Sequence, residues 1–160
     1  MSLPQNQSPI LRELNTSDAA AMASLHALSF AEPQQWTADS IRGLMLQPTT
    51  QSFALGHNDA ILGFMMASFV ANEAEILTLA MHPEQRRKGY AKRLIKHFIQ
   101  LHRIQKLQKI FLEVAANNSA AINLYRSLGF TIIATRANYY TQQIGIKPLK
   151  VDGLVMSKTF

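Results

Sequence analysis

The sequence has no cysteine among its 160 residues, which excludes disulfides, thiolate metal ligands and a cysteine nucleophile. It also lacks a long apolar run, because the stretch 60–70 is too short and too interrupted to cross a bilayer. The first nine residues are polar and lack the apolar segment of a signal peptide. We therefore expect a cytoplasmic protein that is neither exported nor membrane-embedded.

Acidic residues are fewer than basic ones, with 10 Asp and Glu against 16 Lys and Arg and a net charge of +6. This excess favours an anionic partner, such as a phosphorylated cofactor, a nucleic acid or an acidic protein. The hydrophobic fraction of 48% is enough for a folded core. At this length one domain is expected, with a loose leader over residues 1–8 and the domain over 9–160.

Apolar periodicity and turn residues predict a chain of alternating helices and strands, hence an α/β domain with one mixed sheet. Strands are predicted at 10–14, 51–55, 60–70, 75–81, 109–114, 130–136 and 151–158, and helices at 16–29, 37–46, 90–105 and 119–128. The residues 16–18 are expected to cap the first helix and Thr37 the second, and 56–59 has the composition of a turn. The long helix makes the strands 75–81 and 109–114 parallel neighbours, which predicts a cleft at their carboxyl ends.

A basic loop with a glycine leads from the strand 75–81 into the long helix, and it contains Arg86, Arg87, Lys88 and Gly89. Free backbone N–H groups at a helix start, with a glycine that permits close approach, suit a pyrophosphate. The simpler interpretation is a turn glycine beside a solvated basic face. Neither a Walker loop nor a Gly-x-Gly-x-x-Gly fingerprint is present.

The residues 86–91, Arg-Arg-Lys-Gly-Tyr-Ala, match the signature Gln/Arg-x-x-Gly-x-Gly/Ala, with Ala91 at the second glycine position. Further segments of the same pattern follow in order: Glu75 to Pro83, Leu112-Glu113-Val114, Asn118, Ala120 to Ile122, Leu124-Tyr125-Arg126, Leu128-Gly129-Phe130 and Arg136 to Tyr140. Over about residues 9–158 the chain resembles the GNAT superfamily of acetyl-CoA-dependent N-acetyltransferases, in its RimI-like branch of ribosomal-protein-alanine N-acetyltransferases. The resemblance implies a single-domain GNAT fold, a mixed, mostly antiparallel sheet that is split between its fourth and fifth strands and flanked by helices.

The resemblance also implies direct transfer of an acetyl group to an amine, with Glu113 as general base and Tyr125 as general acid. A carboxylate near the interior can accept the amine proton, and a phenol can protonate the departing thiolate. Each residue also has a simpler structural interpretation. Glu113 would be an edge-strand carboxylate in a salt bridge with Lys109 or Arg136, and Tyr125 a core aromatic.

Acetyl-CoA is the cosubstrate that the resemblance implies, and no metal is expected because the five histidines lack ligand spacing. The strand backbone of Leu79, Ala80 and Met81 would bind the pantetheine arm, with the Met81 N–H as the oxyanion donor. The pyrophosphate would be held by Arg86, Arg87, Lys88, Gly89, Tyr90, Ala91 and Lys92. Asn118 matches a cofactor-binding asparagine, and it also reads as a helix cap.

The expected acceptor is a protein N-terminal α-amine, possibly of a ribosomal protein, because its pKa of about 7.7–8.0 lies below that of lysine. Tyr139 and Tyr140, taken as a loop, would form part of the acceptor wall or simply cover a sheet edge. Ala115 and Asn117 depart from the family pattern, and the insert between the aromatic residues at 30 and 36 is longer than usual. These departures leave the acceptor open.

Three other functions remain open from the sequence. The chain could acetylate a small-molecule amine, or it could bind CoA as a partner-binding module without turnover. Nucleic-acid binding through the basic face of the 90–105 helix is not favoured, because no aromatic residues interleave with its charges. No membrane partner is expected, and both a monomer and a homodimer fit the sequence.

Overall fold

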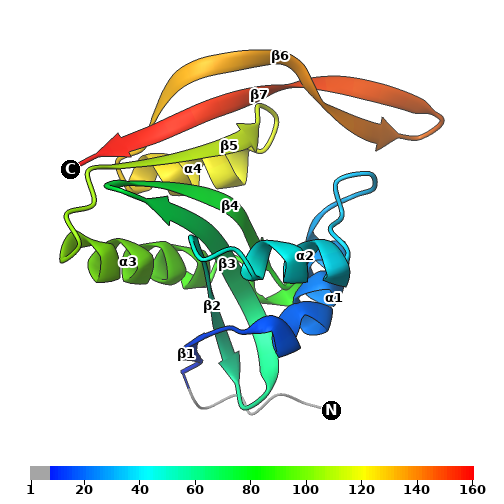
Figure 1. Cartoon of the computed structure of the whole chain (residues 1–160). Coiled ribbons are helices and arrows are strands. Elements are labelled where there is room, and N and C mark those ends of the chain that lie inside the picture. Colours follow the sequence, from blue (N-terminus) through cyan, green and yellow to red (C-terminus); the bar gives the residue numbers. More distant parts are fainter. Residues whose placement is uncertain (1–7) are drawn as a thin grey trace.

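A computed structural model describes residues 8–160 of the chain, so most of the leader predicted over 1–8 lies outside the described residues. Seven strands form one sheet in the order β1-β2-β3-β4-β5-β7-β6 (Figure 1). The strands are β1 (Ile10–Glu13), β2 (Thr50–His57), β3 (Ala60–Val70), β4 (Glu73–Met81), β5 (Lys109–Ala115), β6 (Thr131–Ile144) and β7 (Lys147–Thr159). The helices are α1 (Ala19–Ser29), α2 (Ala38–Met45), α3 (Tyr90–Arg103) and α4 (Ser119–Ser127), with short 3₁₀ turns η1 (Thr16–Asp18) and η2 (Pro83–Gln85).

The predicted crossover is confirmed, because β4 and β5 pair in parallel while the other neighbouring strands pair antiparallel. The amphipathic α3 joins them and buries Leu94, Ile95 and Phe98 against the sheet. Leu101, which the same periodicity suggests for the core, is 40% exposed. A second core forms on the opposite face, where α1 and α2 cover apolar residues of β2, β3 and β4. The result is the α/β layout expected from the sequence.

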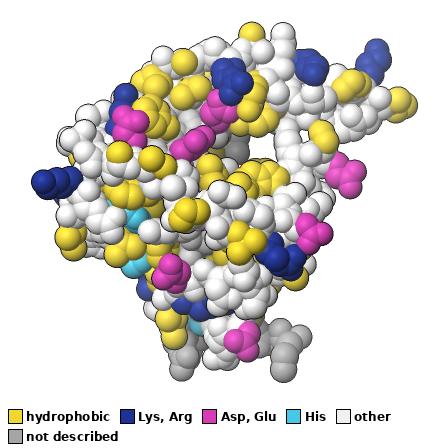
Figure 2. All heavy atoms as spheres, viewed as in Figure 1, with side chains coloured by type: hydrophobic (Ala, Val, Ile, Leu, Met, Phe, Trp, Pro, Cys, Tyr) yellow, Lys and Arg dark blue, Asp and Glu magenta, His cyan; other side chains and the backbone are white. Residues whose placement is uncertain are grey.

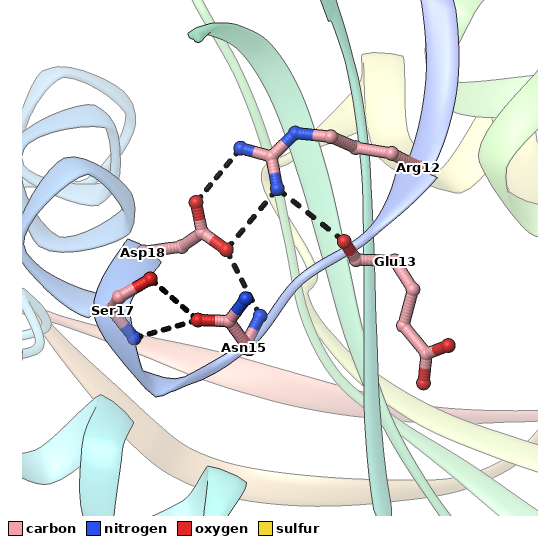
Figure 3. Close-up of polar contacts among 5 residues, drawn as sticks. All are labelled: Arg12, Glu13, Asn15, Ser17 and Asp18. Carbon is pink, nitrogen blue, oxygen red and sulfur yellow. Dashed lines mark hydrogen bonds and ion pairs between the residues drawn. The ribbon is translucent and has the colours of Figure 1, made fainter.

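The start of α1 differs from its prediction (Figure 3). Residues 16–18 form the separate turn η1 rather than the cap of α1, and Asn15 caps it by accepting a hydrogen bond from the Ser17 N–H at 2.9 Å. Asp18 accepts from the Asn15 N–H at 2.9 Å and pairs with Arg12 at 2.7 Å. This pair ties the turn to β1, and the hydrogen bond from Arg12 lowers the pKa of Asp18. Thr37, in contrast, caps α2 as predicted, through its bond from the Ser40 N–H.

The last two strands are longer than the sequence predicts, since β6 continues from residue 136 to 144 and β7 begins at 147 instead of 151. Tyr139 and Tyr140 therefore lie in a strand and not on a loop, which corrects the prediction. Most of β6 is exposed on both faces, so burial leaves no alternation in its sequence, and pairing with β7 holds it extended. In Figure 1 this β6–β7 ribbon extends past β5 above α1 and α2.

Candidate active site

A gap opens between β4 and β5 where their parallel register ends, at the pair Ile76 and Leu112. A β-bulge in β4 lies at the same level, because the pairing with β3 shifts between Met66 and Ala67. Bulges increase the local twist of a strand, which turns the end of β4 away from its neighbour. Figure 2 shows a hollow on this face, between the β6–β7 ribbon above and the α1 and α2 layer below. The cleft predicted at the carboxyl ends of β4 and β5 is thus present.

The backbone of β4 beyond the bulge presents polar groups to the gap. The His82 N–H donates to the Leu62 carbonyl at 2.8 Å, so the alternating ladder directs the N–H groups of Leu79 and Met81 away from β3. That direction faces β5, which no longer pairs with β4 here. The carbonyl of Met81 accepts a hydrogen bond from the Ser29 hydroxyl at 3.1 Å, which ties α1 to this strand end. Ala80 between them is buried.

The basic loop after β4 has the backbone geometry of an anion site. Gly89 precedes α3 with φ 79°, a left-handed conformation, and it has no side chain to cap the first turn. The free N–H groups at the start of α3 are therefore available to an anion. Arg86, Arg87 and Lys88 are exposed beside it, and Lys88 donates to the Gln85 side chain at 2.9 Å.

Three of the residues predicted to bind the cofactor also have other places in the structure. Gly89 and Lys92 line a hollow of about 430 Å³ between α3 and β1, together with Arg93, Lys96 and His97. This hollow lies at the β1 edge of the sheet, three strands from the gap beside β4. Asn118 caps α4, because its side-chain oxygen accepts from the Ala121 N–H at 3.2 Å, as its simpler interpretation predicts.

Glu113 lies near the end of β5, on the face opposite the buried residues Leu112 and Val114. Its carboxylate accepts a hydrogen bond from Arg136 of β6, with Nη1 and Oε1 2.6 Å apart. Within residues 8–160, Glu113 forms no other ion pair, and in particular none with Lys109. The salt bridge considered from the sequence is therefore present, although β5 is an interior strand and not an edge.

Tyr125 lies on α4 and is 6% exposed, with its ring packed edge-on against Phe130. Burial, and to a smaller degree the nearby Tyr140, raises the pKa of Tyr125 far above its usual value. The phenol is thus neutral and able to donate a hydrogen bond at any working pH. Tyr125 is a core aromatic, as its simpler interpretation states, and its buried environment also keeps its hydroxyl protonated.

The sequence named Arg136 only as one of two alternative salt-bridge partners of Glu113, and it did not connect Tyr140 with either predicted catalytic residue. Burial, with smaller contributions from Glu113 and Tyr139, raises the pKa of Tyr140 to about 12. Arg136 opposes that shift, and its own pKa is raised chiefly by the hydrogen bond to Glu113. The pairing of β5 with β7 and of β7 with β6 brings Arg136 to Glu113, so the local sequence could not decide between Lys109 and Arg136 as its partner.

Within residues 8–160, no group of three His, Cys, Asp or Glu side chains is placed to hold a metal ion. His82 instead accepts the Glu84 N–H at 3.3 Å and begins η2. Within residues 8–160, no helix is both long and apolar enough to cross a membrane.

A parallel strand pair that splits beside a bulged strand, with an anion site at the following helix, is the arrangement of a CoA-dependent acyltransferase. Residues 14–130 match the acetyltransferase (GNAT) family, so the chain belongs to that family and is an N-acetyltransferase of the GNAT type. Members of this family use acetyl-CoA, and the gap, the free N–H groups and the basic loop fit it. The RimI-like resemblance expected from the sequence is confirmed by the relatives.

Two curated relatives carry the name [ribosomal protein bS18]-alanine N-acetyltransferase. The Salmonella typhimurium protein is 31% identical over 148 residues, which is 90% of this chain and 93% of that protein. The Escherichia coli K12 protein is 33% identical over 106 residues, 66% of this chain and 69% of that one. The crystal structure of the Escherichia coli ribosomal-protein-S18-alanine N-acetyltransferase aligns with a TM-score of 0.84 and 26% identity, covering 94% of this chain and 93% of that one. Arabidopsis thaliana NAA60 in complex with acetyl-CoA shares the fold, with a TM-score of 0.79, 20% identity and coverage of 94% and 98%.

Proposed function

We propose that this chain transfers the acetyl group of acetyl-CoA directly to a protein N-terminal α-amine, with Glu113 as general base and Tyr125 as general acid. The observation that carries the proposal is the ion pair of Glu113, from β5, with Arg136 of β6 beside the gap. Tyr125 lies on α4 with its ring against Phe130, and its buried phenol stays protonated. The names of the relatives support an N-terminal alanine of a ribosomal protein as the acceptor.

The chemistry divides among these groups as follows. Glu113 takes a proton from the acceptor ammonium, and the resulting amine nitrogen forms a bond to the thioester carbonyl carbon. The Met81 N–H, which faces the gap, donates to the oxyanion. The carbon–sulfur bond then breaks, the sulfur receives a hydrogen bond and finally a proton from Tyr125, and the nitrogen releases its second proton to solvent, from which the phenol is re-protonated. No covalent enzyme intermediate is required.

The raised pKa of Tyr125 limits how it assists. A CoA thiol has a pKa near ~8.5, below that of the buried phenol, so complete transfer of the proton is uphill until the phenol is re-protonated from solvent. Hydrogen-bond donation to the developing thiolate is therefore the larger part of its contribution. Glu113 is half-buried, with its side chain 24% exposed, so it can reach both the acceptor and the solvent that removes its proton.

For the cosubstrate, we propose that Leu79, Ala80 and Met81 bind the pantetheine arm through the strand backbone. Residues 86–92 would hold the pyrophosphate, at the uncapped start of α3. Asn118 would contribute from the start of α4, a role compatible with its cap. These assignments are tested by the stability of the protein, because a ligand at 100 times its dissociation constant stabilises the folded state by about 2.7 kcal/mol.

The test compares wild type with Glu113→Gln and Tyr125→Phe in an assay of released CoA thiol. Unblocked peptides that begin with alanine serve as acceptors, beside the same peptides with an acetylated N-terminus and a set of small amines. Each variant should lose about 100-fold or more in kcat, while the shift of the melting temperature by acetyl-CoA is retained. Glu13→Gln, an exposed carboxylate on β1, is the matched control and should keep full activity. Full turnover by both active-site variants would refute the assignment.

The alternative functions give different results in the same assay. A small-molecule acetyltransferase would release CoA with small amines and not with peptides. A CoA-binding module would show the melting shift with acetyl-CoA and with CoA, without any release. Absence of a melting shift would remove the cosubstrate assignment itself.

A further inference from the structure

The guanidinium of Arg136 occupies the carboxylate that the proposed acceptor amine needs. Its Nη1 donates to Oε1 of Glu113 at 2.6 Å, and its central carbon lies 3.9 Å from the ring centroid of Tyr139. The Arg136 side chain is 51% exposed, against 24% for Glu113. The cation therefore has two partners, one carboxylate and one aromatic face, and free solvent on its other side.

A specific backbone device holds Arg136 in this place. The register of β6 with β7 shifts between Arg136, which faces Gly153, and Tyr140, which faces Val151. Residues 137–139 thus bulge out opposite the single residue Asp152. The Asp152 carboxylate accepts from the Asn138 N–H at 2.8 Å, and Asn138 has φ 54°. A residue in this left-handed conformation needs such support, so the bulge is fixed by its own hydrogen bond.

The groups around Glu113 explain why Arg136 can leave and return. Tyr139 lies against the guanidinium, and within residues 8–160 Glu113 makes no second ion pair. An exposed ion pair contributes little to stability, so its exchange is inexpensive. The stacking on Tyr139 is a second anchor that does not depend on Glu113, and it keeps Arg136 near the site when the ion pair opens.

We propose that Arg136 is a positioning residue that holds Glu113 for the acceptor and is exchanged for the acceptor's ammonium group. This inference rests on the proposed function, in which Glu113 is the base. One cation replaces another on the carboxylate, and the ammonium then gives one proton to Glu113, which leaves a neutral amine and a neutral carboxylic acid. After acetyl transfer the proton passes to solvent, and Arg136, still on Tyr139, pairs with the carboxylate again. The ion pair would thus favour acceptors that bring a charged ammonium.

Binding of an acceptor peptide to the enzyme saturated with CoA tests the exchange without turnover. The probe is an unblocked octapeptide that begins with alanine, titrated by calorimetry beside its N-acetylated form. Arg136→Gln removes the competing cation, so the unblocked peptide should bind about two- to five-fold more tightly than it does to wild type. The acetylated peptide should show no such gain. Arg136→Lys retains a cation and should resemble wild type, as should Arg126→Gln, an exposed arginine on α4.

Steady-state kinetics add a second readout. Arg136→Gln should lower the acceptor KM by the same factor while kcat also falls, because Glu113 loses the group that orients it. A purely structural role would not lower KM. Equal or weaker binding of the unblocked peptide to Arg136→Gln, or an equal gain for the acetylated peptide, overturns the exchange.

The two proposals fail separately. Full turnover by Glu113→Gln refutes the general-base role, whatever Arg136 does. Loss of turnover in Glu113→Gln, together with no tighter binding in Arg136→Gln, leaves the base role intact and refutes the exchange alone. A peptide that does not bind to the wild-type complex or to the Arg136→Gln complex also refutes the exchange.

Discussion

The substitution Gly153→Ala probes the packing on which the active-site bulge depends. A Cβ at Gly153 would lie 3.1 Å from Cδ1 and 3.2 Å from Cβ of Tyr139, tighter than ordinary van der Waals contact. The ring that would be pushed is the one that stacks on Arg136. The substitution should therefore disturb the bulge while leaving every group of the proposed chemistry in the sequence.

The magnitude follows from two opposing effects. Overpacking costs about 1–3 kcal/mol, and replacing glycine by alanine gains about 0.4–1 kcal/mol by restricting the unfolded chain. The free energy of unfolding should thus fall by about 0–2.6 kcal/mol in urea titrations followed by circular dichroism. In a Tyr139→Ala background the contact with the ring is removed and only the one with Cβ remains, so the same substitution should cost less than it does in wild type.

Gly43→Ala on α2 is the matched control. A Cβ there meets no atom within 4 Å, so alanine should stabilise the helix by about 0.5–1 kcal/mol. An equal loss from Gly153→Ala with and without the Tyr139 ring would refute the packing argument.

Two further predictions concern stability and pH. Asp18→Asn should lower the free energy of unfolding by about 1–2 kcal/mol at neutral pH. Because the pKa of Asp18 is lowered in the folded chain, this difference from wild type should narrow as pH falls below about 4. It should vanish when Asp18 is protonated in both the folded and the unfolded chain. Burial lowers the pKa of His26 to about 4, and its Nδ1 accepts a hydrogen bond from the backbone N–H of Trp36. Between about pH 6.5 and 4, the unfolded chain therefore takes up a proton at His26 that the folded chain does not. Wild type should therefore lose stability as pH falls across that interval. His26→Asn keeps an acceptor but no titrating group, so its urea midpoint should depend less on pH. Parallel plots of urea midpoint against pH for the two proteins would contradict the lowered pKa of His26.

Local sequence signals predicted the parts of the fold that depend on neighbouring residues. The hydroxyl at Thr37 caps α2, the glycine at 89 takes the left-handed conformation before α3, and the apolar spacing of α3 buries its inner face. A local signal was misread at residues 16–18, where Asn15 competes for the backbone N–H groups and forms a separate 3₁₀ turn. Apolar periodicity does not predict the end of β6 or the start of β7, because strands that pair without being buried have no alternation of apolar and polar residues.

The sequence by itself determined the family, the parallel crossover and the residue types for the chemistry, since each resides in a contiguous motif or a periodic segment. Tertiary structure alone decided where the gap opens, because the shift between Met66 and Ala67 is a property of two paired strands. It also decided that Arg136 pairs with Glu113, 23 residues earlier in the chain. Such a contact depends on the register of β5 with β7 and of β7 with β6, which is set by the folded sheet and by no single segment.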